Sequence, residues 1–250
     1  MNPLPYWLPP LVVAPFIGSF LGVLIQRLPE SRAVVLGRST CDHCGHRLGV
    51  ADLVPIVSFV LSRRKCRYCG ARIGVFPLAI ELAALALAAW ASITVEDGDL
   101  WMTCLFGWTL LTLAWIDLRT MMLPDVLTLP LLAAGLAATE LIDPDSFASH
   151  GIAAAVGYFS LLAVAWSYRR LRGRDGIGLG DAKLLGAIGA WLGLALLPIT
   201  LLLAACLGLL AAGCAALAGR RVAAATAIPF GPCLALAAWL LWLYGDRLIG

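Results

Sequence analysis

Long apolar runs restrict the fold of this chain more than any other feature of its sequence. Of its residues, 61% are hydrophobic and 13% are charged, whereas soluble globular domains average about 45–50% and 25%. A helix of about 20 apolar residues crosses the roughly 30 Å hydrocarbon core of a bilayer. The sequence therefore predicts an all-α polytopic membrane protein. Its formal net charge of +3 is too small to indicate a nucleic-acid partner.

Eight transmembrane helices are predicted, near residues 8–26, 76–95, 100–116, 123–142, 148–168, 182–197, 198–218 and 223–245. Only Pro198 separates the sixth run from the seventh, and a proline either kinks one long helix or separates two. Their combined length favours two helices. The first run is expected to remain as a membrane helix and not to be a cleaved signal, because no positive charge precedes it.

The basic residues predict the orientation of these helices, since Lys and Arg gather in cytoplasmic loops. Nine of the eighteen lie between Arg27 and Arg72, and five lie between Arg169 and Lys183. The loops on the other side carry acids instead: Glu96, Asp97, Asp99, Glu140, Asp143 and Asp145. The N-terminus is therefore predicted to lie outside, with segments 27–75 and 169–183 in the cytoplasm.

Four cysteines form two CxxC pairs in the first polar segment: Cys41 with Cys44, and Cys66 with Cys69. Twenty-one residues separate the pairs, a spacing typical of structural zinc sites with four thiolate ligands. Disulfides are the alternative, but thiols stay reduced in the cytoplasm. The predicted domains are a first membrane helix over 1–27, a zinc-binding loop domain over 28–75 and a seven-helix membrane core over 76–250.

Four thiolates complete a tetrahedral shell, so the predicted Zn²⁺ is structural and holds the loop together. His43 and His46 are alternative ligands that this shell does not need. A glycine follows each pair, Gly45 and Gly70, as a tight turn beside a metal requires. The apolar interval 51–61 is too short to span the bilayer and is expected to pack on the membrane or on the helices. The other cysteines are predicted to be small core residues: Cys104, Cys206, Cys214 and Cys233.

Two aspartates at the ends of predicted helices are the candidate catalytic residues. Asp117 ends the third span, where the helix dipole disfavours a negative charge. Asp181 begins the sixth span. Two spans lie between them, so both reach the cytoplasmic side of the membrane. Asp125 also begins a helix, but an acid there caps free amides and suits the dipole, so it needs no catalytic role. For Asp181 the same capping role is the alternative.

The segment Gly178-Leu179-Gly180-Asp181 suits a site that must admit a peptide. Gly178 and Gly180 permit the close approach of a substrate backbone and unusual dihedral angles beside the acid. Two carboxylates held close share a proton. One can then take a proton from an attacking water while the other, protonated, polarises the scissile carbonyl. The pattern indicates an aspartic peptidase at the membrane edge.

Three other classes of protein fit the sequence less well. A zinc metallopeptidase would need an open His/Glu motif such as HExxH, which the sequence lacks. The isolated His150 is expected to be interfacial on the outer side. A transporter would place acids near the bilayer midplane, whereas these two aspartates lie at helix ends. A non-catalytic, zinc-bearing membrane assembly protein is the remaining alternative.

The chain resembles the type IV prepilin peptidases, which are bifunctional leader peptidases and N-methyltransferases among the GxGD intramembrane aspartic proteases. The resemblance covers nearly the whole length and rests on both CxxC pairs and on the segments 18–21, 27–29, 117–125, 178–185 and 229–232. It implies that Asp117 and Asp181 are the catalytic pair and that Asp125 is not. The chain departs from the family pattern at Gly22, where Asn is usual, and in the segment 76–81, where Tyr-Pro followed three residues later by Glu is more typical.

The resemblance also implies a reaction and a location. Members cleave the leader of type IV prepilins or type II secretion pseudopilins at the cytoplasmic face of the bacterial inner membrane. They then methylate the new N-terminal residue, usually Phe, from S-adenosylmethionine. No glycine-rich methyl-donor motif is visible in this sequence. A peptidase without methylation is therefore the alternative.

Overall fold

The computed structural model describes residues 5–34, 39–173, 178–219, 229–245 and 247. Regular structure within these residues is helical, with two isolated β-bridges. In this part of the chain, six helices are long and apolar enough to cross a membrane, and α8 is a shorter apolar helix. The predicted all-α membrane class is confirmed. Features predicted at 174–177 and 220–228, including the start of the last span, lie outside the described residues.

The outer surfaces of the long helices carry apolar side chains. Ile93 of α3, Leu141 of α5 and Leu202 of α7 are 82%, 83% and 67% exposed. In water such side chains would favour aggregation, whereas in lipid they match the solvent. The exterior is therefore that of a multi-pass membrane protein.

The chain divides into two compact units, Met1–Thr112 and Leu113–Gly250. Helix α4 (Leu100–Thr120) begins in the first unit and ends in the second. The division of the chain at residues 28 and 76 remains a prediction. The first unit also contains α1 (Leu8–Arg27), η1 (Val50–Asp52), α2 (Val57–Leu61), α3 (Phe76–Thr94) and η2 (Asp97–Asp99).

Helices α1 and α3 pack closely because small residues meet at their contact. A Cβ atom added to Gly18 would lie 2.6 Å from Glu81 Cα and 3.0 Å from Ala84 Cβ, so only glycine fits. Trp108 Nε1 donates a hydrogen bond to the Ala84 carbonyl oxygen at 3.0 Å and ties α4 to α3. Close packing of this kind holds helices together in lipid, where the hydrophobic effect does not.

The interval between the two cysteine pairs is attached to α3 through one buried acid. Ile56 has a positive φ of 61°, and its N–H donates to Glu81 Oε2 at 2.7 Å. Glu81 is only 6% exposed, and a buried carboxylate needs such a donor. The apolar side chains of the neighbouring α2, including Val57 and Leu61, stay exposed. One hydrogen bond thus attaches this interval to α3, and packing of its apolar side chains on the membrane or on the helices stays a prediction.

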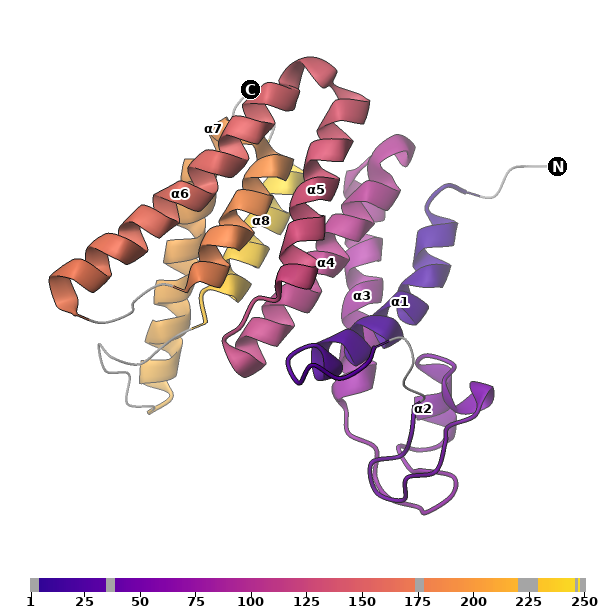
Figure 1. Ribbon diagram of the computed structural model, residues 1–250. Helices are drawn as coiled ribbons and strands as arrows, with labels where there is room; N and C mark the ends of the chain where they lie inside the picture. Colours follow the sequence, from indigo (N-terminus) through magenta and orange to yellow (C-terminus); the bar gives the residue numbers. More distant parts are fainter. Residues whose placement is uncertain (1–4, 35–38, 174–177, 220–228, 246, 248–250) are drawn as a thin grey trace. The chain divides into compact units, whose positions relative to one another are not determined.

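The second unit contains α5 (Asp125–Ile142), η3 (Pro144–Ser146), α6 (Phe147–Arg172), α7 (Leu179–Leu217) and α8 (Gly231–Tyr244), with α6 packed along α7 (Figure 1). Glycines bring these two helices together. A Cβ atom on Gly189 would lie 2.5 Å from the Ala153 carbonyl oxygen, and one on Gly157 would lie 2.7 Å from the Leu185 carbonyl oxygen. Trp191 Nε1 donates to the Leu131 carbonyl oxygen at 2.8 Å and fixes α5 against α7.

Helix α7 is interrupted at Gly193, not at Pro198. Gly193 has φ 72° and ψ 179°, a conformation that only glycine adopts without strain, and the chain folds back there into two arms (Figure 1). These arms correspond to the sixth and seventh predicted spans. The predicted join at Pro198 is wrong, because a proline near the start of the second arm removes one hydrogen bond without reversing the chain.

His150 supports the turn in α7. Its Nδ1 lies 3.0 Å from the Ala190 carbonyl oxygen and 3.2 Å from Thr139 Oγ1. A break at residue 193 interrupts the helical hydrogen bonds around it, and His150 supplies a partner for one of these carbonyls. This histidine is therefore half-buried between helices, where a simple interfacial position was expected.

Candidate functional site

A buried carboxylate lies at the end of α4. Asp117 is in the last turn of this helix and is 5% exposed. Its Oδ2 accepts a hydrogen bond from the backbone N–H of Gly231, the first residue of α8, at 3.0 Å. The first N–H groups of a helix lack partners within it and form the positive end of its dipole. The start of α8 therefore compensates for the unfavourable position of Asp117 at the end of α4.

Only glycine can make this contact at position 231. A Cβ atom there would lie 2.7 Å from Asp117 Oδ2 and 3.0 Å from its Cγ. Real Cβ atoms do not approach an oxygen that closely. Any larger residue would displace either the carboxylate or the start of α8.

A second carboxylate comes from the start of α7. Asp181 is the third residue of this helix and is 9% exposed. Its Oδ2 lies close to Gly178, the residue before the helix, and the charge of Asp117 acts on its carboxylate. The structure thus brings Asp117 and Asp181 together in the second unit.

The pair has the arrangement required for acid–base chemistry. Two neighbouring carboxylates removed from water cannot both be charged without a large electrostatic penalty, so one proton is shared between them. Asp117 has a fixed amide donor in Gly231. A fixed donor holds its carboxylate in place while a proton moves.

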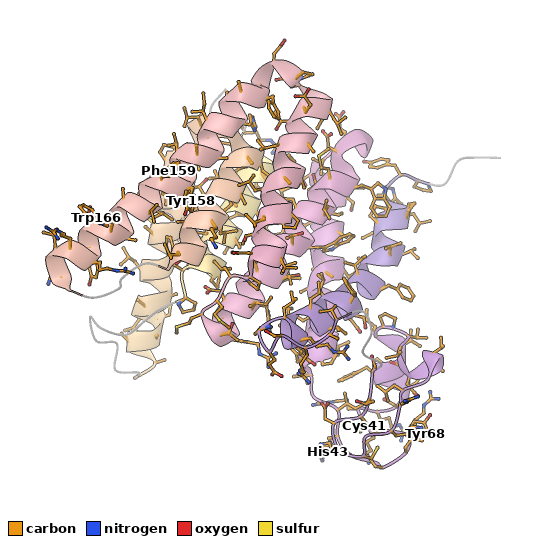
Figure 2. The ribbon with its side chains drawn as sticks, in the orientation of Figure 1. Cys41, His43, Tyr68, Tyr158, Phe159 and Trp166 are labelled. Carbon is orange, nitrogen blue, oxygen red and sulfur yellow. The ribbon has the colours of Figure 1, made fainter. Side chains whose placement is uncertain are left out.

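Four thiols gather in the loop of the first unit (Figure 2). The Sγ atoms of Cys41, Cys44, Cys66 and Cys69 all lie within 4.8 Å of one another, and those of Cys41 and Cys69 are 3.9 Å apart. Zn–S bonds of about 2.3 Å place the sulfurs of a tetrahedral site about 3.8 Å apart. A disulfide needs about 2.05 Å, and all four cysteines are free. The cluster fits a tetrathiolate metal site and not a pair of disulfides.

Each cysteine pair lies in the same kind of backbone turn. The N–H groups of Gly45 and Gly70 each donate to the carbonyl oxygen of the first cysteine of their pair, at 2.8 and 2.9 Å. Both glycines have positive φ, 68° and 71°, so the tight turns predicted there are confirmed. Backbone N–H groups of Cys44 and His43 lower the pKa of the Cys41 thiol to about 6, whereas desolvation and the three neighbouring thiols raise the pKa of the Cys69 thiol to about 11.

The four clustered cysteines and the two aspartates fall in separate matches to known families. Residues 12–95 match the bacterial peptidase A24 N-terminal domain, and residues 104–213 match the type IV leader peptidase family. Prepilin leader peptidase/N-methyltransferases from Dichelobacter nodosus, Aeromonas hydrophila and Pseudomonas aeruginosa are 35%, 36% and 35% identical to the chain. The alignments cover 93%, 93% and 99% of this chain, and 89%, 88% and 93% of those proteins. The chain belongs to the type IV prepilin leader peptidase/N-methyltransferase family. No solved structure matches it.

In this member of the prepilin peptidase family, Asp125 has a partner of its own. It begins α5, and its two carboxylate oxygens accept hydrogen bonds from Lys183 Nζ at 2.6 and 2.8 Å. Its side chain is 53% exposed. Sequence reasoning expected Asp125 to cap the helix, whereas the structure shows an ion pair that links the starts of α5 and α7.

The glycines of the GxGD segment have different surroundings. Gly178 is exposed, and a Cβ atom there would lie 3.3 Å from Asp181 Oδ2. Gly180 meets Leu123 instead, whose Cβ would lie 2.9 Å from an added Cβ. Gly178 therefore leaves space beside the acid, and Gly180 lets α7 begin against the connection between α4 and α5.

Sequence reasoning missed two residues of this site. The sequence predicts no role for Gly231, which lies in the segment 229–232, and predicts Cys233 to be a core residue. The half-buried Cys233 thiol interacts electrostatically with both aspartates. The available signal was a glycine followed by Pro232 at the start of an apolar run, because proline in the first helical turn marks a helix start with free amides.

The other four cysteines and the two loop histidines lie outside the thiol cluster. Cys104 is buried as predicted, but Cys206 and Cys214 are exposed on α7, so their assignment to the core is wrong. An apolar thiol suits a lipid-facing surface as well as a core. Neither His43 nor His46 joins the thiol cluster in the described part of the chain, and the His46 ring stacks on Tyr68 with ring centroids 3.6 Å apart.

Proposed function

We propose that this chain cleaves the leader peptides of type IV prepilins or type II secretion pseudopilins, with Asp117 and Asp181 as the catalytic pair. The pair of buried carboxylates at the end of α4 and the start of α7 carries the proposal. Family membership supplies the reaction class and the substrate, since the relatives are named prepilin leader peptidases.

In the proposed mechanism the two aspartates have different roles, because only one of them carries the shared proton. The unprotonated aspartate accepts a proton from the attacking water, and the protonated aspartate donates a hydrogen bond to the scissile carbonyl oxygen. The Gly231 amide keeps the Asp117 carboxylate oriented throughout. The space beside Gly178 admits the extended substrate backbone.

The proposed site lies at the cytoplasmic face of the bacterial inner membrane. The clustering of Lys and Arg in the segments 27–75 and 169–183 supports this orientation. It places the cleaved bond where a charged leader leaves the bilayer and its hydrophobic continuation remains in lipid. A bond at that boundary is within reach of water, which hydrolysis consumes.

We assign the four thiols a structural Zn²⁺. Cys41, Cys44, Cys66 and Cys69 would hold the ion, and four thiolates leave no open position for a water or a substrate. The ion would cross-link the loop and would take no part in the cleavage reaction.

The same chain is proposed to methylate the new N-terminus from S-adenosylmethionine. The relatives' names include N-methyltransferase, and their similarity extends over both units. Mass spectrometry of the N-terminus of a processed pilin from the same cell distinguishes this from a peptidase alone. An unmethylated residue would reduce the function to cleavage.

Substitution of either aspartate tests the peptidase proposal most directly. Asp117→Asn or Asp181→Asn should each abolish cleavage of a prepilin by the purified protein in lipid nanodiscs, because an amide cannot exchange the shared proton. Losses of about 10⁴-fold or more are expected for groups that act as a unit. Cleavage is measured as the mass shift of the substrate.

The shape of the aspartates is preserved in these variants, so zinc content and thermal unfolding should match those of the unaltered protein. Wild-type cleavage by either variant would refute the assignment of the pair. Asp181→Glu is a further check, since it keeps a carboxyl group that can carry the proton but shifts this group by the length of one methylene.

A further inference from the structure

One face of α2, in the loop between the two cysteine pairs, carries large apolar side chains that are mostly exposed. Val57, Val60 and Leu61 are 51%, 62% and 70% exposed. Their spacing of three and four residues places them on the same side of the helix. Ser58 and Phe59, on its other side, line a cavity between the loop, α1 and α3. Apolar side chains gathered on one exposed face mark an interaction surface.

Basic residues follow this face directly. Arg63 and Arg64 come one residue after α2, and both are exposed. From residue 53 to residue 80 the chain has five Lys and Arg residues and no Asp or Glu. Within the described residues Arg63 and Arg64 form no ion pair, whereas Arg67 contacts Asp52 at 3.3 Å. The surface beside the apolar face therefore carries positive charge that no acid compensates.

The backbone holds these two arginines next to the apolar face. Their φ angles are positive, 51° and 61°, and residues other than glycine keep such a conformation only where the surrounding structure imposes it. The Ile73 N–H donates to the Arg64 carbonyl oxygen at 2.7 Å. The Arg64 guanidinium lies 5.8 Å from the centroid of the Phe59 ring. The chain thus turns sharply at the end of α2 and leaves both cations beside it.

Helix α2 begins at the level of the first turns of a membrane helix. Ile56 precedes α2, and its N–H donates at 2.7 Å to Glu81, the sixth residue of α3. This acid lies about 8 Å from the start of α3. The 19 residues of α3 rise by about 28 Å, close to the thickness of the hydrocarbon core, so its first turns lie at the boundary with the headgroups. Amphipathic segments bury their apolar faces about 5–10 Å into this boundary.

The charges favour lipid over a second copy of the chain as the partner of this face. A symmetric contact between two copies would bring the arginines of both together, and like charges repel. Anionic headgroups attract exposed cations that lie next to an apolar segment. The combination of apolar and basic side chains therefore fits an anionic membrane surface.

We propose that the apolar face of α2 inserts into the membrane interface beside α3, with Arg63 and Arg64 at the headgroups of anionic lipids. Lipid then covers Val57, Val60 and Leu61, and the cysteine-bearing loop is held against the membrane by α2 as well as by α1 and α3. The proposal goes beyond cleavage and methylation and rests on neither reaction.

The first test identifies what lies against the face. The full-length protein with the substitution Val60→p-benzoylphenylalanine is placed in nanodiscs of phosphatidylcholine and phosphatidylglycerol and irradiated. Mass spectrometry of the peptide that contains position 60 should show phospholipid adducts. Adducts to a second copy of the chain, or displacement of the lipid adducts by added prepilin, would assign the face to a protein partner and overturn the proposal.

Tyr68→p-benzoylphenylalanine is the matched control for this cross-link. Tyr68 is 53% exposed, and it lies with Cys41 and His43 toward the end of the loop that points away from the long helices (Figure 2). The substitution keeps the aromatic ring that stacks on His46. Lipid adducts should be about tenfold fewer here, because the position lies outside the interfacial layer. Equal yields at the two positions would overturn the proposal.

The second test measures the contribution of the anionic headgroups by hydrogen exchange. The Val60 and Ser62 amides, which donate to carbonyl oxygens four residues earlier, should exchange more slowly in the anionic nanodiscs than in phosphatidylcholine alone, since lipid binding stabilises the docked loop. Arg64→Gln should reduce this difference about fivefold, the effect of one cation near an anionic surface. Identical exchange in the two lipids would overturn the role of the headgroups.

Arg47→Gln is the control for the charge change. Arg47 is an exposed arginine of the first cysteine turn, bridged to Thr40, and it is not next to α2 in the chain. The difference in exchange between the two lipids should stay within about twofold of that in the unaltered protein. An effect equal to that of Arg64→Gln would show a general response to charge and contradict binding at the apolar face.

The outcome is independent of the proposed function. Both leaflets of a nanodisc have the same lipids, so the predicted orientation does not enter. Prepilin cleavage by the unaltered protein is measured in separate samples. Failure to cleave would refute the proposed function and leave the docking face in place, whereas cleavage without lipid adducts at position 60 would refute the docking face alone.

Discussion

Each unit of this protein buries an acid on a membrane helix and gives it a backbone amide as partner. In the first unit Glu81 accepts the Ile56 N–H at 2.7 Å, and in the second Asp117 accepts the Gly231 N–H at 3.0 Å. The difference lies in the next neighbour. Asp117 has Asp181 beside it, whereas Glu81 has the Ser19 side chain. A single buried acid anchors a loop and lines a cavity, but a pair can share and move a proton.

The donors differ in origin as well. The Gly231 amide begins α8 and carries the dipole of a helix. The Ile56 amide belongs to a residue with positive φ in a loop that the cysteine cluster constrains. With Zn²⁺ held by the four thiols, as proposed, the geometry of the acid in the first unit would depend on the cysteine cluster, whereas that of Asp117 depends on helix packing. Substitutions can separate these two dependences.

The largest effect outside the aspartates is expected from Gly231→Ala. The added Cβ would lie 2.7 Å from Asp117 Oδ2, so the carboxylate must move, and displacements near 1 Å cost about 100-fold in rate. Prepilin cleavage should fall by about that factor, while zinc content stays unchanged. Gly213→Ala is the matched control, since an added Cβ there meets nothing within 4 Å. Equal cleavage by the two variants would contradict the proposed role of Gly231.

An intermediate effect is expected from Cys41→Ser. Loss of one of four thiolates should reduce bound zinc, measured by atomic emission, and should expose residues 39–73 to limited proteolysis. The cleavage activity of the remaining folded protein should not respond to added zinc. A zinc-dependent rise in its turnover would show that the metal is catalytic. Cys206→Ser, at an exposed thiol of α7, should leave zinc content unaltered.

The smallest effect is expected from Asp125→Asn. This change removes the ion pair with Lys183. The side chain of Asp125 is 53% exposed, and that of Lys183 is 33% exposed. Partly exposed pairs contribute less than about 1 kcal/mol to stability, so thermal unfolding should shift slightly and cleavage should persist at about wild-type level. Loss of cleavage comparable with that of Asp117→Asn would place Asp125 in the catalytic site.

Much of this organisation could be predicted from local patterns. Runs of apolar residues locate the helices, and the repeated Cys-Gly pattern correctly predicts two turns with positive φ at Gly45 and Gly70. Counting the spans between Asp117 and Asp181 places both at one face. This count predicts that both aspartates lie at the same side of the membrane. It does not predict that they are neighbours, because that depends on how α4 and α7 pack.

Long-range packing explains what was missed. Gly231 meets Asp117 across 114 positions of the sequence, and no local pattern predicts which amide will approach which acid. The fold-back in α7 was expected at Pro198 because proline is the stronger local signal. The structure has it at Gly193, where φ is 72°. Reversal of the chain requires a residue that adopts positive φ, and the loss of one backbone N–H at a proline does not produce it.

The fold-back at Gly193 also bears on the bilayer itself. The arm over 179–192 rises by about 20 Å, less than the roughly 30 Å of hydrocarbon in an average membrane. Its residues from Leu184 to Gly193 are all buried against other helices, so protein and not lipid surrounds this short arm. The depth at which the start of α7 holds Asp181 is therefore set by the position of the fold-back among the packed helices of the second unit.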